Sequence, residues 1–215
     1  MQLQAENENL RKENEQLEAV VSECQRAVTE YAARYAFMVL DADRDGLIGV
    51  DELLRFELFA SYGQTVVERI HAQFDYSSGF HGHLNIEDFI RLNSWTEDRD
   101  SKRSQNFWFR VVDVDGDGVL SIHDMKWLYD QIWKDEATCV SFEDLVCQVH
   151  DMAGKPPPWR NADFGSGRGL GGDGVMLSEI RKSRLAPGIF GILLNHNDML
   201  LRRSTAEFSK TDVPM

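Results

Sequence analysis

The first forty residues carry a hydrophobic repeat with a period of seven. One series of positions, called d in a heptad, is occupied by Leu3, Leu10, Leu17, Cys24 and Tyr31. The series called a is occupied by Asn7, Asn14, Val21 and Val28. Asparagine at position a is tolerated in parallel dimers and fixes their register. The pattern predicts a coiled-coil helix over residues 1–28 and a homodimer through residues 3–28. The alternative is one amphipathic helix whose leucines pack on its own domain.

An acidic segment follows the heptads, and no glycine or proline separates the two. Residues 41–52, DADRDGLIGVDE, place acids at positions 1, 3 and 5, glycine at position 6 and glutamate at position 12. In an EF-hand loop these acids, with the backbone carbonyl at position 7, ligate a hard cation, and a bidentate glutamate selects calcium. The predicted ligands are Asp41, Asp43, Asp45, the carbonyl of Leu47, and Glu52.

A second loop of this kind spans residues 113–124, DVDGDGVLSIHD. Its predicted ligands are Asp113, Asp115, Asp117, the carbonyl of Val119, and Asp124. Asp124 stands where such loops usually have glutamate and is one methylene shorter, so we expect it to give one oxygen rather than two. The loop therefore predicts weaker calcium binding, with magnesium as the alternative ion.

The spacing of the two loops indicates a repeat. They begin 72 residues apart, and a repeat of half that length places a further loop at residues 77–88. That segment keeps the glycine, the apolar residue and the final acid but has serine, glycine and histidine at the ligand positions. A fourth loop falls at 168–179, and its first positions lie within a Pro/Gly-rich insertion at 153–172. We expect both segments to be degenerate loops that keep the helix–loop–helix frame without a metal.

The repeat predicts an all-α fold: a coiled-coil helix followed by two EF-hand pairs, each with one functional and one degenerate loop. The predicted units are residues 1–28 for the coiled coil, 29–97 for the first pair, 98–205 for the second pair and 206–215 for a flexible tail. Exposed loop backbone needs a hydrogen-bonding neighbour. We expect the residues at position 8 to supply it: Ile48 and Leu84 in the first pair, Leu120 and Val175 in the second.

The composition and net charge of the chain argue against several classes of function. A net charge of −13 argues against nucleic acid as a partner, because binding phosphates needs a basic face. The three widely spaced cysteines predict a reducing compartment and therefore a cytoplasmic location. The chain has no run of eighteen apolar residues, so we expect no membrane span. No nucleophile–base set is present and the carboxylates are committed to metal, so we expect no enzymatic activity.

Three segments resemble the B-double-prime regulatory subunits of protein phosphatase 2A: NFWFRVVDVDGDGVLSIHDMKWLYDQ, SFEDLVCQVHDM and IRKSRLAPGIFGILLN. The resemblance covers residues 31–208 and is most specific around Trp108–Gly118 and Phe142–Gln148. It implies a calcium-responsive subunit that docks on the phosphatase scaffold and catalytic subunits and directs substrate choice. By the same resemblance, the acids named above in loops 41–52 and 113–124 are the calcium ligands.

The chain departs from that family at two points. The family closes its DVDGDG loop with glutamate, where this chain has Asp124. It also has a longer N-terminal region that helps engage the scaffold, where this chain has the heptads. A second function therefore stays open. It is a calcium-sensing coiled-coil adaptor or a structural protein associated with the cytoskeleton or the centrosome.

Overall fold

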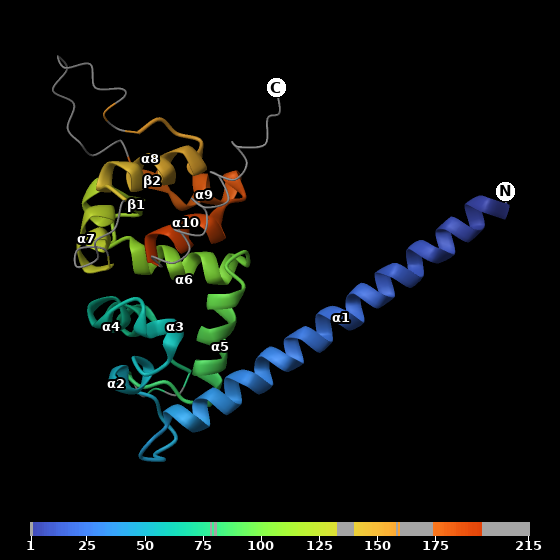
Figure 1. Cartoon of the computed structure of the whole chain (residues 1–215), viewed down its shortest axis with the longest axis horizontal. Helices are drawn as coiled ribbons and strands as arrows, with labels where there is room; N and C mark the ends of the chain where they lie inside the picture. The colour runs from blue at the N-terminus through green and yellow to red at the C-terminus, as the bar shows by residue number, and fades with distance from the viewer. Residues whose placement is uncertain are drawn as a thin grey trace, which may run out of the picture.

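A computed structural model describes residues 2–77, 79, 81–132, 140–157, 159 and 174–194. Within these residues the chain is helical, apart from a two-stranded sheet and one isolated β-bridge. Figure 1 shows a long N-terminal helix that projects from a body made of the other helices. The predicted all-α fold class is confirmed.

The helix that projects from the body also packs against it at its C-terminal end. α1 (Gln2–Leu40) has 39 residues and is about 58 Å long at 1.5 Å per residue. Near its C-terminal end, Ala33, Phe37 and Leu40 are buried, and their spacing of four and three places them on one helix face. Phe37 meets Phe89 of α5 (Ile86–Glu97) edge to face, with ring centroids 5.8 Å apart. This end of α1 is therefore held by the body, and the rest extends beyond it.

The loops of the first two units are joined by a β-bridge. The helices around them are α2 (Val50–Leu53), α3 (Glu57–Ala60), α4 (Gln64–Gln73) and α5. The N–H of Ile48 donates to the carbonyl of Leu84 at 2.8 Å, and the N–H of Leu84 donates to that of Ile48 at 2.9 Å. Both side chains are fully buried. The expected pairing at position 8 is confirmed here.

The second pair is joined by a two-stranded sheet. Its elements are α6 (Lys102–Val112), β1 (Val119–Leu120), α7 (Ile122–Ile132), α8 (Phe142–Ala153), β2 (Val175–Met176), α9 (Leu177–Ser183) and α10 (Ala186–Leu194). The strands are antiparallel, and Leu120 lies opposite Val175, as expected. A Cβ on Gly174 would lie 2.6 Å from the carbonyl oxygen of Leu120, so this close approach of the two loops requires glycine.

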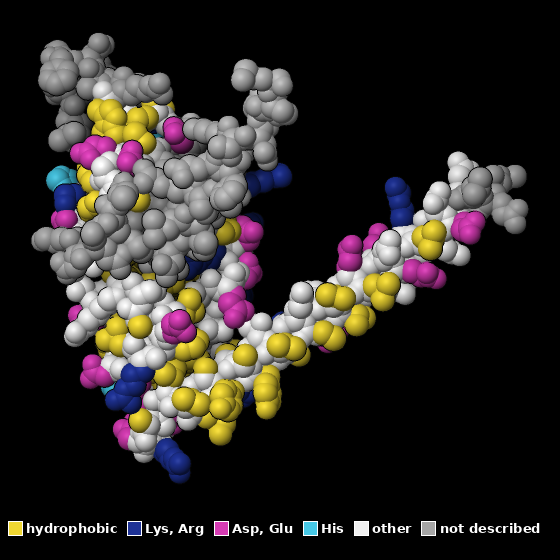
Figure 2. Space-filling model, viewed as in Figure 1, with side chains coloured by type: hydrophobic (Ala, Val, Ile, Leu, Met, Phe, Trp, Pro, Cys, Tyr) yellow, Lys and Arg dark blue, Asp and Glu magenta, His cyan; other side chains and the backbone are white. Residues whose placement is uncertain are grey.

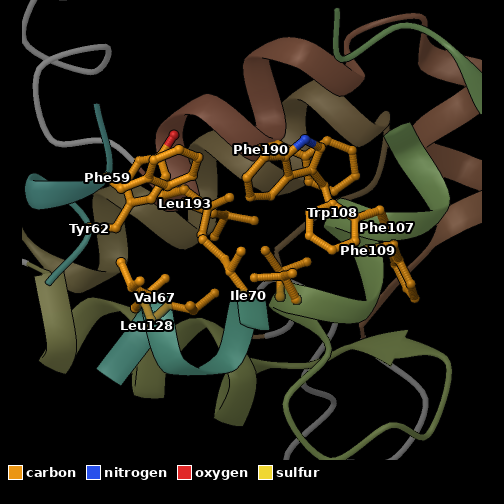
Figure 3. Packing of buried hydrophobic residues seen from close by; sticks show 14 of the residues in the cluster. Phe59, Tyr62, Val67, Ile70, Phe107, Trp108, Phe109, Leu128, Phe190 and Leu193 are labelled. Carbon is orange, nitrogen blue, oxygen red and sulfur yellow. The ribbon is translucent and has the colours of Figure 1, made fainter. Parts of the chain in front are cut away.

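One hydrophobic core joins the two pairs. Trp108 of α6 is fully buried, and its Nε1 donates to the carbonyl of Trp95 in α5 at 2.7 Å. Its ring also meets that of Tyr62, which follows α3, at a centroid distance of 6.4 Å. Figure 3 shows this core, in which Phe190 of α10 lies beside Trp108, and Leu193 of α10 lies on the side of Phe59 and Tyr62 from the first pair. The two pairs therefore form one body.

Arg69, an arginine of the first pair, donates hydrogen bonds to the backbone where α6 ends and the loop at 113–124 begins. The Nε of Arg69 in α4 donates to the carbonyl of Val111 at 2.6 Å, and its Nη2 donates to the carbonyls of Arg110 and Asp113. These are C-terminal carbonyls of α6, which have no partner within the helix. A positive charge is favoured at this end of a helix. Arg69 therefore fixes the start of the second metal loop from outside it.

Some predictions concern residues beyond those described. The tail 206–215 and most of the insertion 153–172 lie outside the described residues, as do the first six positions of the loop 168–179. α8 ends at Ala153, the first residue of the predicted insertion, and is capped by Gly154, whose φ of +73° is left-handed. No helix among the described residues is long and apolar enough to cross a membrane.

We predict that His71 makes the stability of the chain depend on pH. The hydroxyl of Tyr76 donates to the carbonyl of His71 at 3.0 Å, so Nδ1 of His71 donates to that hydroxyl oxygen at 2.8 Å. Burial, with a smaller contribution from His83, lowers the pKa of His71 from 6.5 to about 4. Because the unfolded chain takes up the proton at higher pH, this contribution is complete above pH 6.5. It falls by about 2–3 kcal/mol as the pH approaches 4.

Urea unfolding in a calcium chelator at several pH values between 7 and 4 measures this effect. His71→Gln should flatten the dependence of the unfolding free energy on pH in that range. The exposed His123 provides a matched control, because His123→Gln removes the same group without changing a buried one. Equal pH slopes for the wild type and His71→Gln would contradict the assignment.

Candidate metal sites

The first loop brings its acids together in the way that its sequence predicts. Asp41, Asp43 and Asp45 each direct a carboxylate oxygen into one group whose members lie within 4.8 Å of one another. Short hydrogen bonds hold the turn: the N–H of Gly46 donates to Asp41 at 3.1 Å and the N–H of Leu47 donates to Asp45 at 2.8 Å. Gly46 has a φ of +81°, which favours glycine.

Glu52 closes this loop. Its Oε1 accepts from the N–H of Ala42 at 3.0 Å, and its Oε2 accepts from the N–H of Gly49 at 3.2 Å. The acid at position 12 therefore connects positions 2 and 9 of the loop. Gly49 is also the N-cap of α2, so the bond from its N–H to Glu52, the third residue of that helix, fixes the start of α2.

One atom of the first loop indicates that it fits a cation. Oδ1 of Asp41 is buried and has no hydrogen-bond partner among the described residues. A buried carboxylate oxygen without a partner is costly. A calcium ion would supply the missing partner, since Asp41 occupies position 1 and calcium prefers carboxylate oxygen. The residues present therefore fit the ion that the motif implies.

The second loop repeats this arrangement with more burial. Asp113, Asp115 and Asp117 again direct carboxylate oxygens to within 4.8 Å of one another. The N–H groups of Gly116 and Gly118 donate to Asp113, each at 2.9 Å. Burial raises the pKa of Asp113; these two hydrogen bonds oppose the rise, and the nearby charges of Asp124 and Asp117 add to it. A bound cation would relieve this crowding of negative charge.

Asp124 closes the second loop with the same connections as Glu52. It is buried; its Oδ1 accepts from the N–H of Val114 at 2.7 Å, and its Oδ2 accepts from the N–H of Ser121 at 2.8 Å. The Ser121 hydroxyl adds a bond of 2.6 Å to Oδ2. The shorter side chain therefore still joins positions 2 and 9, with help from a serine at position 9.

The ligand set stays a prediction. The structure brings together three of the predicted acids in each loop. At position 7, Leu47 directly precedes the paired Ile48, and Val119 itself pairs with Met176. The sequence did not single out Arg69, although its charge lies near Asp113, Asp124 and Asp115. No local pattern could have found it, because it contacts the loop from 44 residues away.

The loop at 77–88 closes without acids at positions 1, 3 and 5. The N–H and hydroxyl of Ser77, at position 1, donate directly to Asp88 at position 12, at 3.1 and 2.7 Å. The guanidinium of Arg91 also contacts Asp88 at 2.8 Å. Among the described residues, the two loops above are the only groups of three acids, histidines or cysteines that could hold a metal.

Comparison with known proteins agrees with the two loops. The EF hand family model matches residues 34–56 and 108–126. A probable B''epsilon regulatory subunit of serine/threonine protein phosphatase 2A from Arabidopsis thaliana is 30% identical over 176 residues, covering 79% of this chain and 30% of that protein. The alpha form of the B'' regulatory subunit from Homo sapiens is 33% identical over 134 residues, covering 57% of this chain and 11% of that protein. The chain is homologous to the B'' regulatory subunits of protein phosphatase 2A.

A solved structure extends the similarity to the helices. A chain of a PP2A PR70 holoenzyme matches with a TM-score of 0.61 at 26% identity. The match covers 79% of this chain and 59% of that one. The present chain spans 30% of the length of the Arabidopsis relatives. The EF-hand loops imply calcium binding.

We predict two calcium-binding events of unequal affinity. The event that depends on Asp41 should have a dissociation constant on the order of 10⁻⁷ to 10⁻⁵ M, and the event that depends on Asp113 should be weaker. Calorimetry of Asp41→Ala and Asp113→Ala assigns the events. Asp51→Ala is the matched control, since it removes an exposed acid of the same loop at position 11, which supplies no ligand. Equal loss of tight binding in both variants would refute the ranking.

Proposed function

We propose that this chain is a calcium-binding regulatory subunit that docks on the scaffold and catalytic subunits of a type 2A protein phosphatase. The observation that carries the proposal is the extent of the structural match. It covers 79% of the chain, whereas the EF hand model matches only residues 34–56 and 108–126. Similarity that includes helices without metal ligands supports a shared role beyond calcium binding.

In this proposal the chain supplies regulation and no catalysis of its own. Its homologues are regulatory subunits. The clustered acids occupy loop positions suited to a cation, so they are committed to metal. When bound, calcium would neutralise the acids of each loop, and sensor EF-hand proteins respond to such binding by changing the angle between the flanking helices.

Each metal loop connects helices of the body, so a change in the angle between those helices would alter the packing of the body. Loop 41–52 connects the buried end of α1 to α2, and loop 113–124 connects α6 to α7. α6 carries Trp108, and its C-terminal end is held by Arg69 of the first pair. A movement of α6 on calcium binding would therefore change contacts in both pairs. We propose that calcium adjusts the docking surface in this way, with magnesium competing at 113–124.

Co-purification tests the phosphatase proposal. The tagged chain should retain the scaffold and catalytic subunits from cell extract, and a calcium chelator should reduce the amount retained severalfold. Asp41→Ala and Asp113→Ala should reproduce the effect of the chelator, while Asp51→Ala should behave as the wild type. If neither phosphatase subunit is retained in calcium or in chelator, the proposed docking is wrong.

One observation favours a second candidate function, that of a calcium-sensing adaptor dimerised through residues 3–28. The a and d residues of the heptads are exposed: Leu10 at 52%, Leu17 at 61%, Val21 at 53% and Val28 at 68%. Figure 2 shows hydrophobic side chains along the part of α1 that projects from the body. The buried Ala33, Phe37 and Leu40 fall at heptad positions f, c and f, on the side opposite a and d. α1 can therefore pack on its own body and still offer the heptad face to a second copy.

Light scattering tests the dimer. The intact chain should have the mass of two copies, and removal of residues 1–28 should give a monomer with unchanged calcium binding. Leu17→Glu should dissociate the dimer, because it places two like charges at one d layer. Gln16→Glu adds the same charge one residue away, outside the a and d positions, and should leave the dimer intact. A monomeric wild type would rule out this dimer.

A further inference from the structure

The fourth loop, 168–179, keeps two groups that face the ion in a working loop. These are the backbone carbonyl at position 7, which is Gly174, and the acid at position 12, which is Glu179. Gly174 and Glu179 are among the described residues, whereas positions 1 to 6 are not. By sequence, positions 1, 3 and 5 are arginine, leucine and glycine, which offer no acid.

A lysine from outside the loop contacts both groups. The Nζ of Lys155 donates to the carbonyl of Gly174 at 2.8 Å and lies 2.8 Å from Oε1 of Glu179. Oε2 of Glu179 accepts from the N–H of Met176 at 2.8 Å, which is the bond that Glu52 and Asp124 make to position 9 of their own loops. The ammonium group thus bridges the position-7 carbonyl and the position-12 carboxylate, two groups that would share a metal ion in a functional loop.

Burial and charge show that this contact is more than a surface ion pair. The side chains of Lys155 and Glu179 are 29% and 25% exposed. Burial alone would raise the pKa of Glu179. The hydrogen bonds from Lys155 and Met176 and the nearby charge of Lys155 outweigh burial, so the pKa of Glu179 lies below its ordinary value. Glu179 is therefore held as a carboxylate beside the ammonium group.

The end of α8 directs Lys155 into this position. Gly154 is left-handed with a φ of +73°, and the N–H of Lys155 turns back to donate to the carbonyl of His150 at 2.9 Å. This is a helix C-cap built on glycine. The cap fixes the backbone at Lys155, so its side chain leaves the helix end at a defined place beside the fourth loop.

The degenerate loop of the first pair has a related contact. There the guanidinium of Arg91 lies 2.8 Å from Oδ1 of Asp88, which is fully buried at position 12. Arg91 also donates to the carbonyl of Asp75. Each loop without a metal-binding acid set therefore has a fixed positive side chain on its position-12 acid. In the loops 41–52 and 113–124, the hydrogen bonds that this acid accepts from described residues come from groups within its own loop.

We propose that Lys155 is the resident cation of the fourth loop: its ammonium group takes the place of a metal ion between Gly174 and Glu179. The loop is thereby kept in its paired form without calcium. Gly174 directly precedes β2, whose Val175 pairs with Leu120 of β1, so the ammonium group steadies the partner of loop 113–124. Calcium entering loop 113–124 then meets a partner that is already ordered. The inference does not depend on docking to a phosphatase.

Hydrogen exchange of the purified chain in a calcium chelator tests the proposal. Lys155→Met keeps the length of the side chain and removes its charge. It should speed exchange of the β1 and β2 amides about tenfold, the factor expected for loss of a charge-assisted hydrogen bond. Lys155→Arg should retain most of the protection. Lys182→Met is the matched control, because this exposed lysine lines the same surface recess and leaves Glu179 with its partner.

Glu179→Gln gives the reciprocal test and decides the matter if Lys155→Met does not fold. It should speed exchange of the β1 and β2 amides as much as Lys155→Met does. The Lys155→Met, Glu179→Gln double variant should exchange no faster than either single variant, because all three remove the same interaction. In calorimetry, these variants should weaken the calcium event that depends on Asp113 severalfold and leave the Asp41 event unchanged. Wild-type exchange in Lys155→Met or Glu179→Gln, or strictly additive effects in the double variant, would overturn the proposal.

Discussion

The acid at position 12 of each loop is the group on which the rest of the structure depends. Glu52, Asp124 and Glu179 each accept the N–H at position 9, one residue after the position-8 residue that pairs with a neighbouring loop. A carboxylate so placed must have its negative charge balanced when it is buried. The difference between the loops is the source of the balancing charge. In two loops the clustered acids call for a metal ion, and in the other two an arginine or a lysine is already present.

This difference gives each pair one loop suited to calcium and one that is closed by the chain itself. The two loops of a pair share backbone hydrogen bonds, so the order of one affects the other. The two pairs in turn share Trp108 and the cap that Arg69 places on the end of α6. Calcium arriving at either functional loop therefore acts on a partner that is already formed and on a core that belongs to both pairs.

The features that could be predicted from the sequence are those set by local patterns. The heptads predicted α1, and the twelve-residue frame predicted the acids that cluster and the residues that pair at position 8. The role of Lys155 could not be read in this way. It lies outside the loop frame, in a Pro-rich stretch that resembles an insertion, and its partner Gly174 is 19 residues away. Likewise, only the packed body brings Arg69 to the end of α6.

The number of calcium ions bound per chain tests the central claim most directly. Native mass spectrometry of the chain, titrated with calcium at constant ionic strength, counts bound ions without assuming a binding model. The account predicts two ions per chain at saturation, with one lost in Asp41→Ala and the other in Asp113→Ala. A third saturable calcium ion that survives in the Asp41→Ala, Asp113→Ala double variant would contradict it. Such an ion would have to enter a loop that we assign to Arg91 or Lys155.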